Sequence, residues 1–168
     1  LPDVGTTIFS VMSSLANEHQ AINLSQGFPN FDCAPELKNL VNKYLQNEFN
    51  QYAPMAGANV LLEKLADKIE KLYGAAVNPK TEITITAGAT QALFTAITTF
   101  IKSGDEVILI EPAYDCYGPS IEVCGGVVVP YEMKAPDFKI DWVELEKLIT
   151  SKTRMLIFNT PHNPTGSI

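Results

Sequence analysis

The sequence of 168 residues has no apolar run that approaches the roughly 20 residues of a membrane-spanning helix, so we predict no membrane association. It contains only three cysteines, Cys33, Cys116 and Cys124, which are widely spaced and form no Cys-x-x-Cys pair. This spacing argues against a disulfide framework and against a structural zinc site. We therefore expect reduced cysteines, no metal site and a cytoplasmic location.

Positive charge is also scarce. The chain has 12 Lys and Arg residues against 19 Asp and Glu residues, which gives a formal net charge of −7. A general nucleic-acid-binding protein needs a basic surface, so we predict no nucleic-acid partner. The hydrophobic share of 46% and the length suit a folded domain of ordinary size with its own core.

The order of the expected elements indicates an α/β protein. The first 30 residues look irregular, and the next two segments have the apolar spacing of amphipathic helices, the second of which stops at Gly74. Strands and helices then alternate, which is typical of a mainly parallel sheet. We expect helices over 35–45, 61–72, 89–101, 117–123 and 141–149, and strands over 82–86, 106–110, 126–130 and 154–158.

Ligands of such sheets bind beyond the carboxyl ends of the strands, so the turns after three predicted strands carry the functional information. The first turn, residues 87–90, has small residues and runs straight into a helix. A helix N-terminus suits a phosphate group, although a tight turn packed with small residues explains the pattern equally well. In the second turn, Tyr114 either stacks on a planar ligand or packs the rim of the sheet.

The third turn, residues 159–166, has two X-Pro steps and a glycine, which restrict its backbone to few shapes. Within it, Asn163 offers both a hydrogen-bond donor and an acceptor, whereas a histidine between such prolines, His162, is more often simply exposed. Taken together, the three turns suit a phosphate, a flat ring and a polar ring substituent. A small aromatic phosphate cofactor fits this set better than an extended dinucleotide does.

Four segments of the chain, residues 25–31, 49–52, 86–94 and 159–166, resemble the pyridoxal 5′-phosphate-dependent class I/II aminotransferases of fold type I. Within that family the sequence is most similar to the methionine and kynurenine (glutamine-phenylpyruvate) aminotransferase branch. The resemblance implies a large α/β domain with a mostly parallel sheet and helices on both faces, incomplete in this sequence. It implies an N-terminal arm and small-domain segment over residues 1–32 and the first portion of the cofactor-binding domain over 33–168.

The resemblance also implies the site residues. For pyridoxal 5′-phosphate, the N–H groups of Ala89 and Thr90, after Gly88, would hold the phosphate, Tyr114 would stack on the ring and Asn163 would bind its phenolic oxygen. Tyr52 would reach the phosphate of a second subunit in a homodimer. The substrate would lie against Gly27, Phe9, Phe28 and Asn163. Thr90 stands where some kynurenine enzymes have Tyr, which leaves the substrate preference open.

The implied activity is transfer of an amino group from an L-amino acid, of the methionine, aromatic or glutamine-like type, to a 2-oxo acid. No lysine follows the carboxyl end of a predicted strand, and the one arginine, Arg154, opens a strand at the opposite end. We therefore expect the Schiff-base lysine beyond Ile168, and we expect the 168 residues to be an inactive N-terminal part of an aminotransferase. Two alternatives remain open: a cysteine-conjugate C–S β-lyase with the same cofactor, and a non-catalytic aminotransferase-like domain of a transcription regulator.

Overall fold

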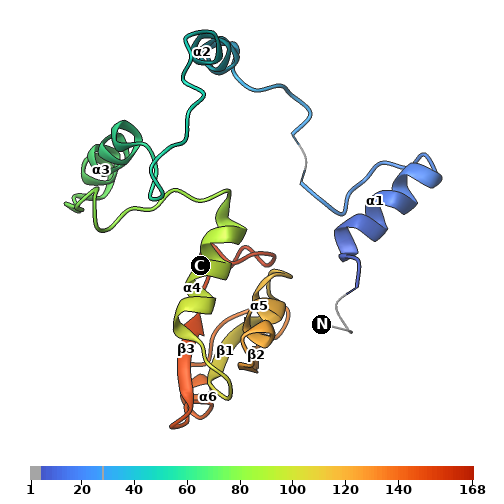
Figure 1. Ribbon diagram of the computed structural model, residues 1–168. Helices are drawn as coiled ribbons and strands as arrows, with labels where there is room; N and C mark the ends of the chain where they lie inside the picture. The colour runs from blue at the N-terminus through green and yellow to red at the C-terminus, as the bar shows by residue number, and fades with distance from the viewer. Residues whose placement is uncertain (1–4, 28) are drawn as a thin grey trace. The chain divides into compact units, whose positions relative to one another are not determined.

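A computed structural model describes residues 5–27 and 29–168 of the chain (Figure 1). The backbone forms two compact units, one of Ile8–Thr86 and the other consisting mainly of Ala87–Ile168. Within the described residues, no helix is both long and apolar enough to cross a membrane. The predicted domain boundary between residues 32 and 33 stays a prediction.

The unit of Ile8–Thr86 contains three helices, α1 (Ile8–Glu18), α2 (Pro35–Gln46) and α3 (Asn59–Tyr73). Helix α2 begins with Pro35 in its first turn, where a missing N–H group costs no hydrogen bond. Helix α3 ends at Gly74, which is left-handed and whose N–H group donates to the carbonyl of Glu70 at 2.8 Å. The two helices predicted from apolar spacing in this region are confirmed.

Helix α1 corrects the expectation that the first 30 residues are irregular. Its apolar residues Ile8, Val11, Met12 and Leu15 follow the i, i+3, i+4, i+7 spacing of one helix face. The helix thus has an ordinary sequence signal, and the expectation of an irregular segment is wrong for residues 8–18. After it, residues 19–34 are without helix or strand in the part that the structure describes.

The unit with Ala87–Ile168 contains a parallel sheet of three strands in the order β2-β1-β3, with β1 (Glu106–Glu111), β2 (Val127–Glu132) and β3 (Thr153–Ile157). Strand β1 lies in the centre and its four middle residues are buried, which explains its nearly continuous apolar sequence. Pro130 lies in β2, which has one paired edge in this sheet, so the missing N–H group is tolerated. The predicted parallel α/β fold is confirmed.

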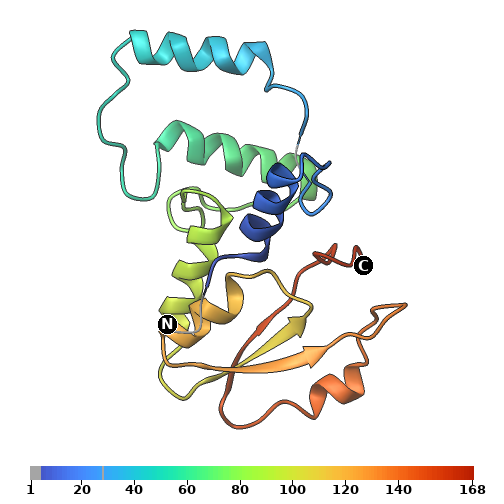
Figure 2. The same cartoon turned by 90° about the vertical axis from the view of Figure 1, so that its right-hand side faces the viewer.

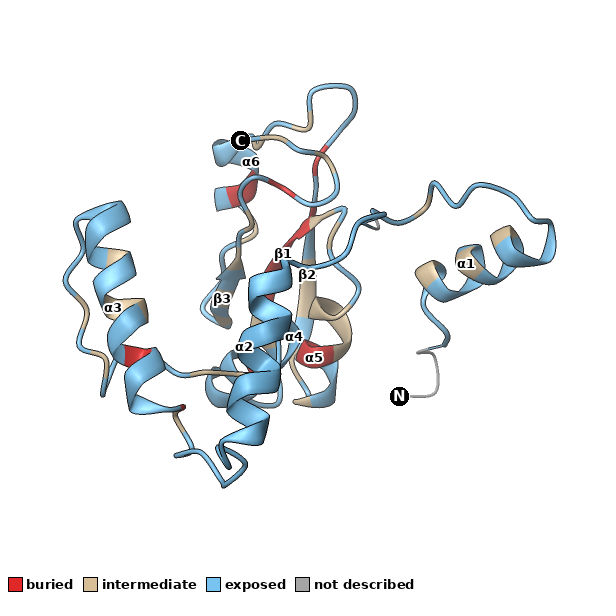
Figure 3. Ribbon diagram, turned by 90° about the horizontal axis from the view of Figure 1, so that it is seen from above, coloured by how far each residue is buried: buried red, intermediate tan, exposed pale blue. Residues whose placement is uncertain are grey.

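Two apolar clusters cover the two faces of the sheet (Figures 2 and 3). On one face, α4 (Ala89–Phe100) and α5 (Tyr117–Val123) bury Ile97, Ile101 and Ile121 against Val107. On the other, α6 (Trp142–Glu146) contributes Leu145 to a cluster with Ile108, Ile110, Tyr131 and Met133. Alternate residues of β1 thus face opposite helices, as the two-residue period of a strand requires.

Two expected elements differ from the structure. Residues 82–86 form no strand, because no described strand lies beside them to complete a ladder. The N–H group of Ile85 instead donates to the carbonyl of Ala56 at 2.8 Å. The helix expected over 141–149 is the shorter α6, whose N-cap Asp141 accepts from the N–H groups of Val143 and Glu144 at 3.0 and 3.2 Å.

Candidate functional site

The three turns singled out in the sequence lie at one edge of the unit with Ala87–Ile168. Strands β1 and β3 are parallel, with one register shift after Glu106 and with Leu109 opposite Ile157, so the segments that follow them emerge at the same edge. Helix α4 precedes β1 and runs in roughly the opposite direction to it (Figure 2). The start of α4 therefore lies toward the carboxyl ends of the strands. We call this edge the carboxyl edge.

The start of α4 has the geometry of an anion site. Gly88 precedes the helix with φ = 85°, a left-handed conformation that favours glycine, and a side chain there would meet no atom within 4 Å. The turn before it is held by the side chain of Gln91, which accepts the N–H group of Ala87 at 2.5 Å. Gly88 has no side chain with which to cap the helix, and the N–H groups of the first turn of an α-helix have no acceptor inside it. Ala89 and Thr90, the first two residues of α4, lie where an anion would be bound.

Tyr114 lies in the loop after β1 and is 36% exposed. Its ring meets the ring of Tyr117 edge to face, with centroids 6.0 Å apart and planes inclined by 63°. The N–H group of Tyr117 also donates to the carbonyl of Tyr114 at 3.2 Å. Burial raises the pKa of the Tyr117 hydroxyl, so this supporting ring is neutral at physiological pH. A tyrosine fixed in this way suits stacking on a planar ligand.

The loop after β3 corrects the expectation for His162. Its side chain is 8% exposed, not simply exposed at the surface, and its Nδ1 atom lies 2.9 Å from the hydroxyl of Thr165. The neighbouring Asn163 is exposed. The loop therefore buries one polar side chain and presents the next one to solvent at the carboxyl edge.

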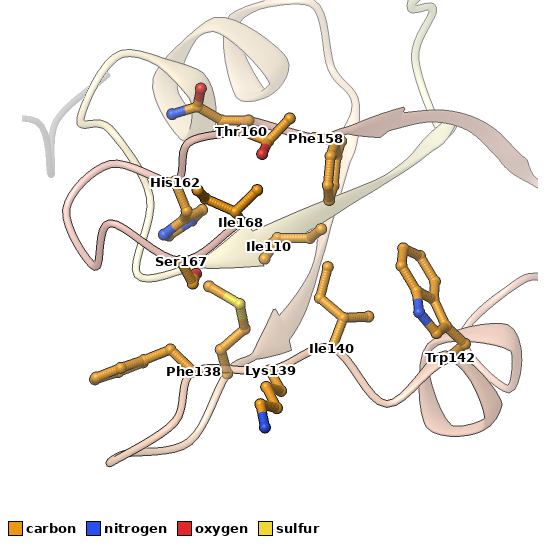
Figure 4. Close-up of a pocket in the computed structure, with 12 residues that line it drawn as sticks. Ile110, Phe138, Lys139, Ile140, Trp142, Phe158, Thr160, His162, Ser167 and Ile168 are labelled. Atoms are coloured by element: carbon orange, nitrogen blue, oxygen red, sulfur yellow. The ribbon is translucent and has the colours of Figure 1, made fainter.

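The structure also shows a cavity of about 300 Å³ that was not expected from the sequence (Figure 4). It opens on the face of the sheet that carries α6, and its walls are mainly apolar side chains of β1, the β2–α6 connection and the loop after β3. They come from segments far apart in the chain, so no local pattern indicates them. The lining residues used below are Ile110, Phe138, Ile140, Trp142, Phe158 and His162.

The remaining predicted site residues belong to the unit of Ile8–Thr86. Phe9 lies on α1 and is half-buried, Gly27 is exposed, and Tyr52 is fully exposed in the connection between α2 and α3. Phe28 lies outside the described residues. The structure thus groups Gly88, Ala89, Thr90, Tyr114 and Asn163 in one unit, and the roles of all nine residues stay predictions.

Within the unit with Ala87–Ile168, positively charged residues lie at both ends of the sheet. Strand β2 ends at Glu132, two residues later than expected, so Lys134 follows its carboxyl end, which corrects the expectation that no lysine follows a strand. Arg154 follows Thr153, which pairs with Glu106 at the start of β1, so it lies at the opposite end of the sheet as expected. Lys102 and Lys152 lie beside it in a shallow polar depression. Lys139 borders the 300 Å³ cavity, on the α6 face, and in Figure 4 its amino group points away from the other lining side chains.

Metal and disulfide chemistry find no support in the described part of the chain. There, no three His, Cys, Asp or Glu side chains come together in a way that could hold a metal ion. Cys33, Cys116 and Cys124 are all free thiols. The chemistry of the carboxyl edge is instead that of hydrogen-bond donors, an aromatic ring and a neutral amide, and this donor set fits a small aromatic phosphate.

Parallel α/β domains of this class bind their ligands in the crevice beyond the carboxyl ends of the strands. The family model described as aminotransferase class I and II matches residues 19–168, and the chain belongs to this family, whose members use pyridoxal 5′-phosphate. Its fold is that of the fold type I aminotransferases.

Several relatives are close. Methionine aminotransferase of Escherichia coli is 48% identical over 168 residues, which cover 100% of this chain and 44% of the relative. Human kynurenine–oxoglutarate transaminase 3 is 36% identical over a match that covers 97% of this chain and 38% of the relative. The solved structure of an E. coli protein with a methionine aminotransferase function has a TM-score of 0.94 at 49% identity, and covers 98% of this chain and 43% of that one.

These relatives confirm the predicted similarity to the methionine and kynurenine aminotransferase branch. The chain spans about two-fifths of the length of the curated relatives that it matches.

Proposed function

We propose that this chain forms the cofactor-binding part of a pyridoxal 5′-phosphate-dependent aminotransferase. The observation that supports this proposal is that the start of α4 and the turns after β1 and β3 belong to one unit, and each offers a group suited to this cofactor. The similarity over the whole chain to a methionine aminotransferase supports it independently.

The proposed roles follow from the chemistry of each turn. The N–H groups of Ala89 and Thr90, after Gly88, bind the cofactor phosphate, where the partial positive charge of α4 favours an anion. The ring of Tyr114, held by Tyr117, stacks on the pyridine ring. The exposed amide of Asn163 donates to the phenolic oxygen. The cofactor supplies an electron-withdrawing ring, which makes a proton on the substrate's α-carbon removable near neutral pH.

The residues of the other unit complete the proposal. Tyr52 reaches the phosphate bound by a second subunit of a homodimer, and its fully exposed side chain is free to do so. Gly27 borders the substrate carboxylate together with Asn163, while Phe9 and Phe28 contribute to an apolar side-chain pocket. Such a pocket favours methionine, aromatic or glutamine-like amino acids as amino donors, in keeping with the names of the relatives.

Catalysis requires a lysine that we do not assign to the 168 residues. We therefore expect the chain by itself to produce no 2-oxo acid from amino acids when it is supplied with pyridoxal 5′-phosphate. The product of the complete gene is expected to do so, with a 2-oxo acid as amino acceptor. A panel of L-amino acids with keto-acid detection tests both statements. Release of pyruvate from a cysteine conjugate, without transamination, would contradict the proposed reaction in favour of a β-lyase.

The assignment of Asn163 has a direct test in the complete gene product. Asn163→Ala removes a hydrogen bond to a charged oxygen, worth about 1.5–3 kcal/mol, so we expect cofactor affinity to fall by about tenfold or more. The matched control is Asn39→Ala, a substitution of an exposed residue on α2, which should leave the affinity unchanged. Equal affinities for both variants, measured by equilibrium dialysis, would remove Asn163 from the site.

A further inference from the structure

His162 is a buried polar side chain to which the proposed function assigns no part. It sits between two prolines, yet it is 8% exposed and lines the cavity beside Ile110 (Figure 4). Burying an imidazole is costly unless its polar atoms are paired. The pairing observed here, of Nδ1 with the hydroxyl of Thr165 at 2.9 Å, ties the ring to its own loop rather than to the sheet.

The backbone of His162 closes the same loop from both sides. Its N–H group donates to the carbonyl of Ser167 at 2.8 Å, and its carbonyl accepts the N–H group of Gly166 at 2.6 Å. The segment between these bonds is Asn163, Pro164 and Thr165. The turn is short, and hydrogen bonds to the backbone of His162 hold its far end at Gly166 and Ser167. The backbone of Asn163 therefore has little freedom to change the direction of its side chain.

The hydroxyl of Thr165 connects the histidine ring to the far end of the turn. Besides His162, it lies 2.8 Å from the hydroxyl of Ser167 and accepts the N–H group of Ser167 at 3.3 Å. Removal of the ring would break this chain of hydrogen bonds. It would also enlarge a cavity that already measures about 300 Å³, so neighbouring side chains would hold the turn less firmly.

We propose that His162 is a positioning residue, which fixes the amide of Asn163 at the carboxyl edge by closing the turn of residues 162–167 through Thr165. This inference rests on the proposed function, because that function assigns Asn163 a hydrogen bond to the cofactor. His162 does not touch the cofactor itself. Its effect on cofactor binding should therefore pass through Asn163 and depend on the hydroxyl of Thr165.

The test uses the complete gene product with pyridoxal 5′-phosphate and three readouts: the cofactor dissociation constant, the visible absorbance spectrum of the bound cofactor, and the temperature of thermal unfolding. His162→Ala should weaken cofactor binding about three- to tenfold and change the spectrum in the same direction as Asn163→Ala. Thr165→Val should do the same to a smaller extent, and Thr165→Ser, which keeps the hydroxyl, should restore the original values. His19→Ala, at the exposed end of α1, is the matched control and should change nothing.

A double-mutant cycle distinguishes positioning from direct contact. In an Asn163→Ala background, His162→Ala should cause no further loss of cofactor affinity, because the group that it positions is already absent. A further loss of the same size would overturn the proposal, as would a lowered unfolding temperature with unchanged affinity and spectrum. Should His162→Ala fail to fold, the Thr165→Val and Thr165→Ser pair decides the question. No cofactor binding by the unaltered protein would instead contradict the proposed function on which the inference rests.

Discussion

The two compact units of this chain have similar helices but very different cores. In the unit with Ala87–Ile168, every middle residue of β1 is buried and helices cover both faces of the sheet. In the unit of Ile8–Thr86, Leu62 is the buried apolar residue among those described, and large apolar side chains of α1, α2 and α3 are exposed. The helices of this chain therefore form whether or not their apolar side chains are buried in a core.

The difference lies in the range of the interactions. A helix satisfies its backbone hydrogen bonds within itself, so α2 and α3 need only a favourable local sequence. A parallel strand needs a partner that is distant in the chain. Pairing β1 with β2 and β3 builds a sheet that buries apolar residues of α4 and α5 on one face and of α6 on the other. The candidate cofactor contacts of Gly88, Tyr114 and Asn163 all belong to the unit in which this long-range pairing is present.

The largest expected effect is the difference in stability between two Ile→Ala substitutions, one in each unit. Ile108→Ala deletes a side chain that is 1% exposed at the centre of the sheet, and should lower the free energy of unfolding by about 2–5 kcal/mol. Ile22→Ala affects a side chain that is 86% exposed, and should change the free energy of unfolding by less than about 0.5 kcal/mol. Urea unfolding followed by circular dichroism measures both. Equal effects would show that the two units do not differ in packing as described.

A smaller effect tests whether the unit of Ile8–Thr86 has any close packing of its own. Gly57 has φ = 121°, and a Cβ atom there would lie 2.4 Å from Cγ1 of Ile85. Gly57→Ala should therefore cost about 1–3 kcal/mol through overcrowding and backbone strain. Hydrogen exchange at the N–H group of Ile85, which bonds Ala56, reports the loss locally.

The control for this substitution is Gly27→Ala, because a Cβ atom at Gly27 meets nothing within 4 Å. In this variant, hydrogen exchange at the N–H group of Ile85 should proceed at the same rate as in the unaltered chain. If Gly57→Ala also leaves the exchange rate unchanged, the approach of Gly57 to Ile85 does not contribute to stability.

The smallest effect concerns thiol reactivity. Burial, and to a lesser degree the charge of Asp115, raises the pKa of the Cys116 thiol above its ordinary value of 9.0, whereas Cys33 is exposed. A raised pKa means less thiolate at a given pH, so Cys116 should react with iodoacetamide more slowly than Cys33 at pH 8. The rate at Cys116 should continue to rise with pH above 9. Mass spectrometry of the peptides would contradict this account if Cys116 were labelled first.

The same contrast between local and long-range structure explains what could be predicted from the sequence. Helices α2 and α3 were predicted because apolar spacing is a local signal, and α1 has that signal too in Ile8, Val11, Met12 and Leu15. Strand β1 was predicted because a strand buried on both faces is apolar throughout. Residues 82–86 have the composition of a strand, but no described neighbour pairs with them, and composition cannot supply that partner.

The candidate site divides in the same way. The turns at Tyr114 and Asn163 could be predicted, because the residues that follow the parallel strands β1 and β3 share one edge. The turn at Gly88 follows no strand in the described part of the chain. The burial of His162 could not be predicted, since it depends on hydrogen bonds to Thr165 and on a cavity wall formed by β1 and the β2–α6 connection.

The central claim is that the carboxyl edge of the sheet binds pyridoxal 5′-phosphate. A crystal structure of the complete gene product with the cofactor tests it most directly. We expect the phosphate within hydrogen-bonding distance, about 3 Å, of the N–H groups of Ala89 and Thr90, the cofactor ring against Tyr114 and its phenolic oxygen at Asn163. A cofactor bound in the 300 Å³ cavity on the α6 face, or at the end of the sheet near Arg154, would contradict the account.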